Sequence, residues 1–417
     1  MTNYEVVKGC FDSTPETQIK LNKIMDTIRK NFELFGFRPF DTPVLEYFET
    51  LAGKYDEDSE IVGEIYRLSD RGERSLGLRY DLTVPMCRYV SSVKQLKLPF
   101  KRYAMAKVFR DGPIKVGRQR EFIQCDADVV GLTGQDAEAE TLDMFYSTYS
   151  ELGIDSVLEI NNNKILQGAF LQFGFDEKEL ESLILSVDKL KKIGKDAVLD
   201  EIAGKGLSQS EAAKAIEILE VKTFDEIKLK ATNETLLLGI CELETLVNGL
   251  DSFGVEYRIN FSMARGLNVY TGNIWEMYDK SKKVTSSIGS GGRYDKVIGD
   301  YAGDGKEYPA FGVSFGLVPI AACLAEKDNK EVSLTEVVVA PLDVELVGAA
   351  QKIAKSIRLA GEKTEVCYDC KLKKAFSYSE YVTAKKLVIL GKKDVEAGVY
   401  TIRDLETKEE EKVSFEF

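Results

Sequence analysis

The sequence predicts an α+β protein with an antiparallel sheet flanked by helices, a helical insertion and a separate small α/β domain. Between residues 64 and 131, short strand-like runs alternate with charged turns. The last two runs have no helix-length connection between them, which favours antiparallel pairing. From about residue 174 to 248 the chain is rich in Lys, Glu, Leu and Ile at helical spacing. After residue 332, strand-like and helix-like segments alternate.

Helices are expected on both sides of these strand-like runs. Residues 13–16 form a helix-capping signal, and apolar residues recur at helical spacing until Gly36, which predicts a long amphipathic helix. A second helix is expected over Asp136–Leu152, after the strand-like runs. Those runs are Glu64–Leu68, Gly77–Asp81, Lys101–Arg110 and Glu121–Val130.

These elements predict a chain of three domains. Residues 1–173 and 250–326 are expected to form one core, interrupted by a helical insertion at 174–249. A charged linker, Glu326–Glu331, would join the core to an α/β domain at 332–417.

Composition excludes several classes of function. The 417 residues carry a net charge of −13, which argues against a generally basic nucleic-acid coat or a binder of anionic membranes. Histidine is absent, so catalysis by Ser-His or Cys-His pairs and His-ligated metal sites are excluded. The polar first thirty residues predict no secretory signal, and seven scattered cysteines predict reduced thiols in a cytoplasm. We expect no membrane span and no metal site.

A basic cluster follows the third strand-like run. Arg110, Lys115, Arg118 and Arg120 would concentrate positive charge in an otherwise acidic protein. Arginine suits phosphate because its planar fork donates two charge-assisted hydrogen bonds. A solvated basic hairpin is the alternative interpretation of this cluster alone.

The next run places polar side chains on one face of a strand. Gln124, Asp126 and Asp128 alternate, so all three point the same way. Asp81 adds an acid after an earlier run. Carboxylates beside arginines suit a site for both an ammonium group and a phosphate, although a surface salt-bridge lattice would explain the same residues.

Two later segments are rich in glycine. Arg265–Gly272 and Gly289–Asp295 allow close approach of backbone to a ligand. Neither fits a P-loop or a dinucleotide-binding fingerprint, and a purely structural role remains an equal alternative.

Together these segments resemble histidyl-tRNA synthetase, a class II aminoacyl-tRNA synthetase, over nearly the whole chain. The resemblance implies a class II synthetase-like antiparallel sheet and a C-terminal anticodon-binding domain. It is carried by Gly36–Leu51, Arg79–Pro85, Phe109–Gly131, Arg265–Gly272, Gly291–Asp295 and, in the last domain, Leu372–Lys374 with Leu387–Gly398.

The resemblance implies that ATP, with Mg²⁺, activates L-histidine to histidyl-adenylate, and that the histidyl group then passes to tRNA(His). It also implies a homodimer, with Pro43 at the interface. If the family's residue roles apply at the matching positions, Arg110 and Arg265 would be the catalytic residues that hold the α-phosphate. Arg118 and Arg120 would serve ATP or the tRNA acceptor end. The implied histidine-binding residues are Asp81, Thr83, Gln124, Asp128, Tyr270 and Tyr294.

Lysines in the last domain would help an acidic protein to hold tRNA, and ordinary solvated surface is their alternative interpretation. They are Lys371, Lys373, Lys374, Lys385, Lys386, Lys392 and Lys393.

Three positions depart from the family pattern. Gly112 stands where the second motif usually has an acid, Val318-Pro319 where the third motif ends in Glu-Arg, and Val269 replaces one of two tyrosines. Two alternatives therefore stay open. One is the histidine-sensing regulatory paralogue of ATP phosphoribosyltransferase, which typically lacks the anticodon-binding domain. The other is a catalytically weak pseudo-synthetase that binds histidine or tRNA.

Overall fold

The computed structural model describes residues 4–53, 60–114, 118–265, 269–325 and 334–416. The expected linker Glu326–Glu331, Lys115 and part of Arg265–Gly272 lie outside these ranges. Contacts divide the chain into two compact units: a larger unit of residues 1–12 and 23–325, and a C-terminal unit of residues 13–22 and 326–417.

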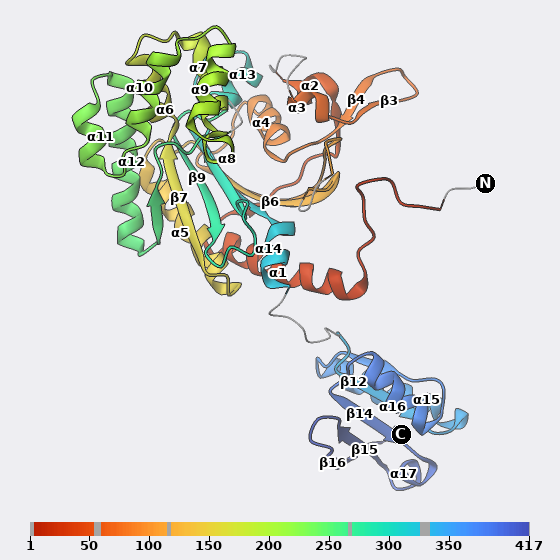
Figure 1. Cartoon of the computed structure of the whole chain (residues 1–417). Helices are drawn as coiled ribbons and strands as arrows, with labels where there is room; N and C mark the ends of the chain where they lie inside the picture. The colour runs from red at the N-terminus through yellow and green to blue at the C-terminus, as the bar shows by residue number, and fades with distance from the viewer. Residues whose placement is uncertain (1–3, 54–59, 115–117, 266–268, 326–333, 417) are drawn as a thin grey trace. The chain divides into compact units, whose positions relative to one another are not determined.

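The larger unit is built on an eight-stranded sheet in the order β1-β5-β6-β11-β10-β9-β7-β8. Its pairs are antiparallel except β1 with β5 and β7 with β8, which confirms the antiparallel prediction for its centre (Figure 1). The strands are β1 (Arg38–Pro39), β5 (Phe100–Phe109), β6 (Glu121–Val130), β7 (Ser156–Asn162), β8 (Tyr257–Ile259), β9 (Asn273–Asp279), β10 (Gly289–Arg293) and β11 (Ala310–Gly316).

Aromatic packing joins helices to one face of this sheet. Phe315 of β11 contacts Phe32 of α1 (Pro15–Leu34) and Phe145 of α5 (Gln135–Glu151), with ring centroids 5.6 and 4.6 Å apart. Because side chains alternate along a strand, Ser314 points to the opposite face. That opposite face carries the polar side chains of β6. Both helices match the sequence-based predictions closely.

A smaller sheet and four helices lie beside β5 and β6. The sheet has the order β2-β4-β3, and α4 begins directly after Asp81 and Leu82. Its elements and the neighbouring helices are β2 (Leu45–Tyr47), β3 (Arg67–Ser69), β4 (Ser75–Leu78), α2 (Phe48–Ala52), α3 (Glu60–Glu64), α4 (Thr83–Ser92) and, from a later part of the chain, α13 (Val297–Ala302).

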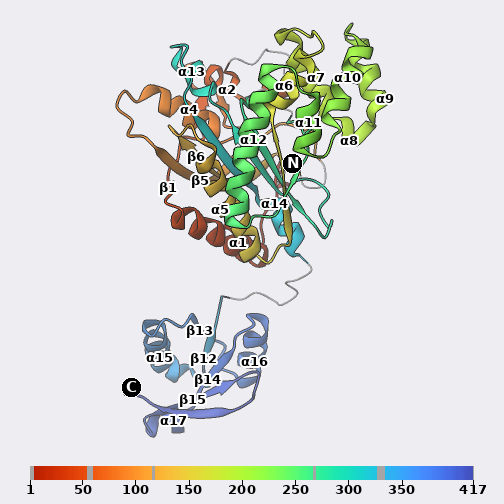
Figure 2. The ribbon, with the colours of Figure 1, turned by 90° about the vertical axis from the view of Figure 1, so that its left-hand side faces the viewer.

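The predicted helical insertion consists of helices joined by short turns and loops. Its last helix, α12 (Glu234–Phe253), passes the predicted boundary at 249 and packs on α5 and α6 (Figure 2). The boundary prediction therefore falls inside a continuous helix, and the segment belongs to the larger compact unit. The helices before α12 are α6 (Asn163–Leu171), α7 (Glu177–Val187), α8 (Leu190–Ile193), α9 (Lys195–Gly204), α10 (Gln209–Leu219) and α11 (Phe224–Lys230).

The C-terminal unit has a five-stranded sheet in the order β13-β12-β14-β15-β16. The first three strands are parallel and the last two pairs antiparallel. This confirms the predicted strand and helix alternation, although α16, α17 and β16 were not predicted. The elements are β12 (Val337–Pro341), α15 (Val347–Leu359), β13 (Thr364–Val366), α16 (Leu372–Tyr381), β14 (Lys386–Leu390), α17 (Lys392–Glu396), β15 (Val399–Asp404) and β16 (Glu410–Ser414).

Candidate functional site

The site lies on the polar face of the eight-stranded sheet, where β6 runs between β5 and β11. Its register places Asp128 opposite Arg102 and Gly312, and Asp126 opposite Ala104 and Ser314. The face therefore combines acidic groups from one strand with mostly small neighbours from the next.

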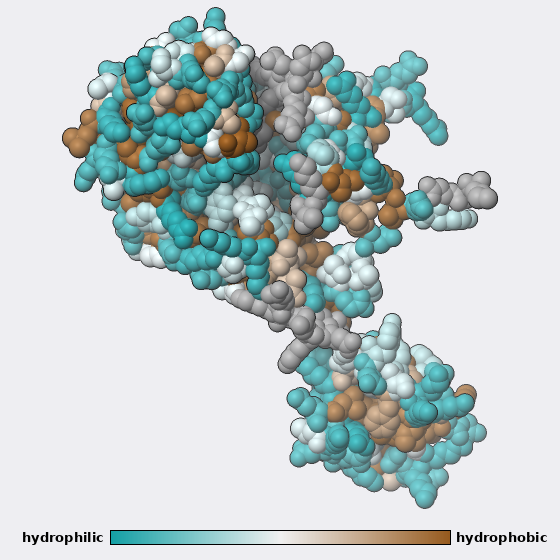
Figure 3. Space-filling view, viewed as in Figure 1, coloured by the Kyte–Doolittle hydropathy of each residue, from teal (hydrophilic) through white to brown (hydrophobic). Residues whose placement is uncertain are grey.

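A cavity of about 2060 Å³ opens above this face, and the space-filling view shows the surface hollowed there (Figure 3). Nine of the ten site residues predicted from the sequence line it. They are Asp81, Thr83, Arg110, Arg118, Gln124, Asp128, Arg265, Tyr270 and Tyr294.

The tenth residue, Arg120, has other partners. Its guanidinium pairs with Asp111 at 2.9 Å and donates to the Gly112 carbonyl at 3.3 Å, and it is not among the residues lining the cavity. Its backbone is also hydrogen bonded to Gly9 and Arg110. The structure therefore gives Arg120 contacts that hold the loop after β5, and the predicted contact with ATP stays an untested prediction.

Arg110 is held at the edge of the cavity by backbone and by an aromatic ring. Its Nε donates to the Tyr80 carbonyl at 3.1 Å, and its guanidinium lies 5.2 Å from the centre of the Phe122 ring. Because the Tyr80 carbonyl is its hydrogen-bond partner among the described residues, this guanidinium keeps most of its five N–H donors for a ligand.

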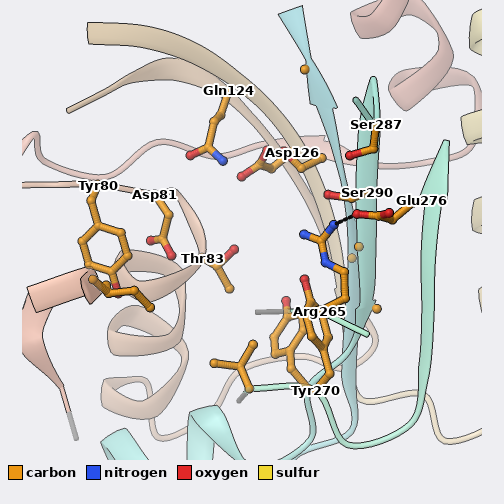
Figure 4. Close-up of a pocket in the computed structure, with 18 of the residues that line it drawn as sticks. Tyr80, Asp81, Thr83, Gln124, Asp126, Arg265, Tyr270, Glu276, Ser287 and Ser290 are labelled. Carbon is orange, nitrogen blue, oxygen red and sulfur yellow. Dashed lines mark hydrogen bonds and ion pairs between the residues drawn. The ribbon is translucent and has the colours of Figure 1, made fainter. Parts of the chain in front are cut away.

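Arg265 approaches the cavity from a distant part of the chain. Its Nη1 pairs with Glu276 of β9 at 2.5 Å, and its guanidinium lies 5.9 Å from the centre of the Tyr270 ring. Figure 4 shows its guanidinium pointing toward the same open space as Asp81 and Asp126. Two arginines from separate segments therefore line one cavity, as the resemblance requires.

Tyr270 can lie against the sheet because residue 292 is glycine. A Cβ at Gly292 would lie 2.6 Å from the Tyr270 ring and 2.8 Å from the Asn273 carbonyl. The carbonyl of Tyr270 also accepts a hydrogen bond from Asn163 at 2.6 Å. This glycine therefore has a steric role in shaping the cavity.

Asp81 and Thr83 stand at the start of α4, opposite Arg265 (Figure 4). One oxygen of Asp81 accepts the Val84 N–H at 3.0 Å, which fixes the carboxylate at the first turn of the helix. Burial raises the pKa of Asp81 to about 6, and the charges of Arg110 and Arg102 oppose the shift. A cationic ligand would lower this pKa by favouring the charged form.

Asp128 is engaged by two neighbours. It pairs with the buried Arg102 at 2.6 Å, and the hydroxyl of Tyr294 donates to its other oxygen. Burial raises the pKa of the Tyr294 hydroxyl well above its usual value, so this tyrosine remains a donor. Asp128 thus lines the cavity with much of its charge already compensated.

Asp126 is also buried, at 4% exposure, but has a neutral partner. Ser314 of β11 donates to its Oδ1 at 2.6 Å. Burial raises the pKa of Asp126 to about 7; Arg102 opposes the shift and Asp128 adds to it. Nearby Gln124 has a buried Oε1 with no hydrogen-bond partner among the described residues. Both groups border the open space (Figure 4).

Sequence reasoning did not assign Arg102, Asp126, Glu276 or Ser314 to the site. The alternation along β6 pointed to Asp126, but Asp126 was not separated from the neighbouring acids. Arg102 could have been found by pairing Phe109 with Glu121 across the loop, since that register places residue 102 opposite residue 128.

The structure shows which groups surround two of the positions that depart from the family pattern. A Cβ at Gly112 would lie 2.9 Å from Cδ of Glu64, so the carboxyl group of another segment occupies the space of a side chain there. Val318 and Pro319 belong to the first turn of α14 (Leu317–Leu324) and line the cavity without charge.

The described ranges contain neither a metal-binding cluster of side chains nor a membrane-spanning helix. No group of three or more Asp, Glu, Cys or His side chains among the described residues is arranged to hold a metal ion. Within the same part of the chain, no helix is both long and apolar enough to cross a bilayer.

Known proteins resemble the chain over its full length. Residues 9–320 match the family described as histidyl-tRNA synthetase, and residues 336–417 match the anticodon binding domain. Histidine–tRNA ligase 1 of Bacillus cereus is 37% identical, covering 98% of this chain and 96% of the relative. The crystal structure of histidyl-tRNA synthetase from Nostoc sp. PCC 7120 superposes with a TM-score of 0.86 at 29% identity, covering 99% and 97% of the two chains.

A Bacillus halodurans structure titled ATP phosphoribosyltransferase regulatory subunit/histidyl-tRNA synthetase has a TM-score of 0.79 at 19% identity, covering 93% of this chain and 98% of that one. At this identity the likeness concerns the fold alone.

The antiparallel sheet, the cavity on its polar face and the anticodon-binding domain define an ATP-dependent aminoacyl-tRNA ligase of class II. The chain belongs to the histidyl-tRNA synthetase family. The predictions of family, fold class and enzyme class are confirmed, and the ligase is supported over the regulatory paralogue.

Proposed function

We propose that this protein ligates L-histidine to tRNA(His) in two steps at the cavity above β6. The observation that carries the proposal is the convergence of Arg110 and Arg265 on one cavity that also contains the polar groups of β6. The full-length similarity to histidine–tRNA ligases supports the same reaction.

In the first step, the histidine carboxylate attacks the α-phosphorus of ATP, and pyrophosphate leaves. Negative charge grows on the phosphoryl oxygens, and Arg110 and Arg265 would stabilise it from two sides. Both guanidinium groups are held by other contacts before ATP binds, so little reorganisation is needed. The carboxylate is already a nucleophile, which suits a chain without histidine.

In the second step, a hydroxyl of the terminal ribose of tRNA attacks the carbonyl of the adenylate, and AMP leaves. Arg118 lines the cavity and is exposed, which suits contact with ATP or with the acceptor end.

The acidic side of the cavity would bind the amino acid. Asp81 and Thr83 would receive the α-ammonium group, because a carboxylate and a hydroxyl both accept hydrogen bonds. Gln124 offers an amide whose carbonyl oxygen has no partner in the described residues. Tyr270, Tyr294 and Asp128 would form the walls around the imidazole ring.

The start of α16 is the best candidate for tRNA contact in the C-terminal unit. Lys371, Lys373 and Lys374 are exposed and have no ion pair with any described residue. By contrast, Lys386 pairs with Glu362, and Lys392 pairs with Asp343 and Glu345. A lysine without an acidic partner releases more condensed counterions when it binds tRNA than a lysine that is already paired.

Mg²⁺ would enter with ATP. No cluster of Asp, Glu, Cys or His among the described residues could hold Mg²⁺ alone. Nucleotide phosphates would therefore be its main ligands. When bound, it would neutralise phosphate charge. A homodimer and a cytoplasmic location follow from family membership as proposals.

Histidine-dependent exchange of pyrophosphate into ATP, followed by charging of tRNA(His), tests this function. Exchange and charging together would support it. Binding of histidine without either reaction would favour the pseudo-synthetase instead.

A further inference from the structure

The acid that anchors Arg265 has a second partner. Nη1 of Arg265 pairs with Oε1 of Glu276 at 2.5 Å, as Figure 4 shows, and the hydroxyl of Tyr278 donates to the other oxygen, Oε2. Glu276 and Tyr278 are two positions apart on β9, so both side chains stand on the polar face of the sheet. Burial and the Glu276 charge raise the pKa of Tyr278, so its hydroxyl stays protonated and remains a donor. The anchoring carboxylate is thus held at both oxygens.

Another acid lies directly across from this anchor. The pairing of β7 with β9 places Glu159 opposite Glu276, and directly opposed residues of neighbouring strands are close on one face. Two carboxylates in this relation repel one another unless each has its own cation. Arg265 supplies the positive charge for Glu276, so Glu159 needs another one.

A lysine of the helical insertion supplies that charge. Nζ of Lys191, on α8, pairs with Oε2 of Glu159 at 2.7 Å and lies 5.6 Å from the centre of the Tyr278 ring. Asn260 also donates to Glu159 at 3.0 Å. One lysine of the insertion therefore contacts both the acid opposite the anchor of Arg265 and the tyrosine that orients this anchor.

We infer that Tyr278 and Lys191 are positioning residues that hold the Arg265 guanidinium toward the cavity. This inference rests on the proposed function, in which Arg265 stabilises the phosphoryl charge, and gives the helical insertion a part in that step. Without the Tyr278 hydroxyl, the Glu276 carboxylate would be free to turn away from the arginine. Without Lys191, the charge of Glu159 would be uncompensated, and the arginine would divide its time between two acids. Either change makes the orientation that suits the phosphate less populated.

Tyr278→Phe tests the first contact, because it removes the hydroxyl and keeps the ring. We expect it to lower kcat of histidine-dependent pyrophosphate exchange by about five- to tenfold and to change the KM for histidine and for ATP by less than about twofold. Tyr257→Phe is the matched control, since the Tyr257 hydroxyl donates to Asp251 at 3.0 Å and residue 257 does not line the cavity. It should leave the exchange reaction unchanged.

Lys191→Met tests the contact from the insertion. It should lower kcat by about threefold, which is less than for Tyr278→Phe because Lys191 is 59% exposed and its ion pair is screened by water. Lys191→Arg keeps the cation and should retain most of kcat. Lys195→Met is the control, because it breaks an ion pair of the same kind, with Glu220 at 2.8 Å, elsewhere in the insertion. It should have no effect on exchange.

The Arg265→Gln background separates positioning from direct contact with substrate, since Tyr278 and Lys191 also line the cavity. If both residues act through the arginine, each substitution should lower kcat by less than about twofold when it is added to Arg265→Gln.

A loss of about twofold or more in that background would overturn the inference. So would a loss below about twofold in the otherwise unmodified protein, a change confined to KM, or a loss in Lys191→Arg equal to that in Lys191→Met. Should Tyr278→Phe fail to fold, the two Lys191 variants decide the question by the same criteria. Absence of histidine-dependent exchange in the unmodified protein would instead reject the proposed function.

Discussion

Replacement of Arg265 by glutamine separates a catalytic role for this arginine from a structural one. The side chain is 19% exposed and pairs at 2.5 Å with Glu276, which is itself 16% exposed. Each charge-assisted hydrogen bond to the developing phosphoryl charge contributes about 1.5–3 kcal/mol. A guanidinium acting as a fixed donor at such a charge is worth about 10²–10³ in kcat.

We therefore expect Arg265→Gln to lower kcat of histidine-dependent pyrophosphate exchange by about 10²–10³. Glu276→Gln keeps the cation and loses only its anchor, so its loss should be about tenfold or less. Arg265→Gln leaves the Glu276 carboxylate without its cation and with the Tyr278 hydroxyl as a remaining donor. The double variant removes that uncompensated charge and should recover thermal stability without recovering kcat. Recovery of kcat in the double variant, or a loss below about tenfold in Arg265→Gln, would refute a catalytic role.

Three further predictions concern stability and tRNA. Arg102→Met leaves Asp128 buried without its cation and should reduce the unfolding free energy by about 3–5 kcal/mol, while the double variant with Asp128→Asn should recover much of it; equal melting temperatures for both variants would contradict this. Asp81 and Asp126 have raised pKa values of about 6 and about 7, so the native state binds more protons than the unfolded one between about pH 4 and pH 7. Stability of the ligand-free protein should therefore fall as pH rises through this window, and Asp126→Asn should flatten the decline in thermal unfolding. Affinity for tRNA should fall steeply with salt, and Lys373→Ala with Lys374→Ala should reduce the slope of log Kd against log salt by about two; an unchanged slope would count against the α16 surface.

Much of the fold could be predicted because local patterns decide it. The capping signal and apolar spacing located α1, and the alternation over Glu121–Val130 located β6 with the bounds that the structure has. The predicted end of the helical insertion at residue 249 lies inside α12, because the apolar stripe of α12 continues onto α5 and no change in composition marks that position.

The candidate site could be predicted only in part, because it also depends on pairings between segments that are distant in the sequence. The arginine cluster and the alternation along β6 indicated part of the cavity lining, and the resemblance to histidyl-tRNA synthetase supplied the rest of the nine residues that line it. Which acids are already paired depends on the register between β5 and β6, which brings Arg102 against Asp128 across 26 positions of chain. Likewise, the pairing of Arg265 with Glu276 depends on how the chain returns to the sheet as β9 after β8, and no local sequence pattern contains that information.

The small residues of β10 and β11 limit how this protein can acquire a new amino-acid substrate. A Cβ at Gly291 would overlap the Gly312 carbonyl, and one at Gly312 would overlap the Asp128 carboxyl group. At these two positions the wall of the proposed amino-acid site is peptide backbone, and an added side chain would require the neighbouring strand or carboxyl group to move. Changes of preference, whether by evolution or by design, would have to act through β6 and the Tyr270 segment.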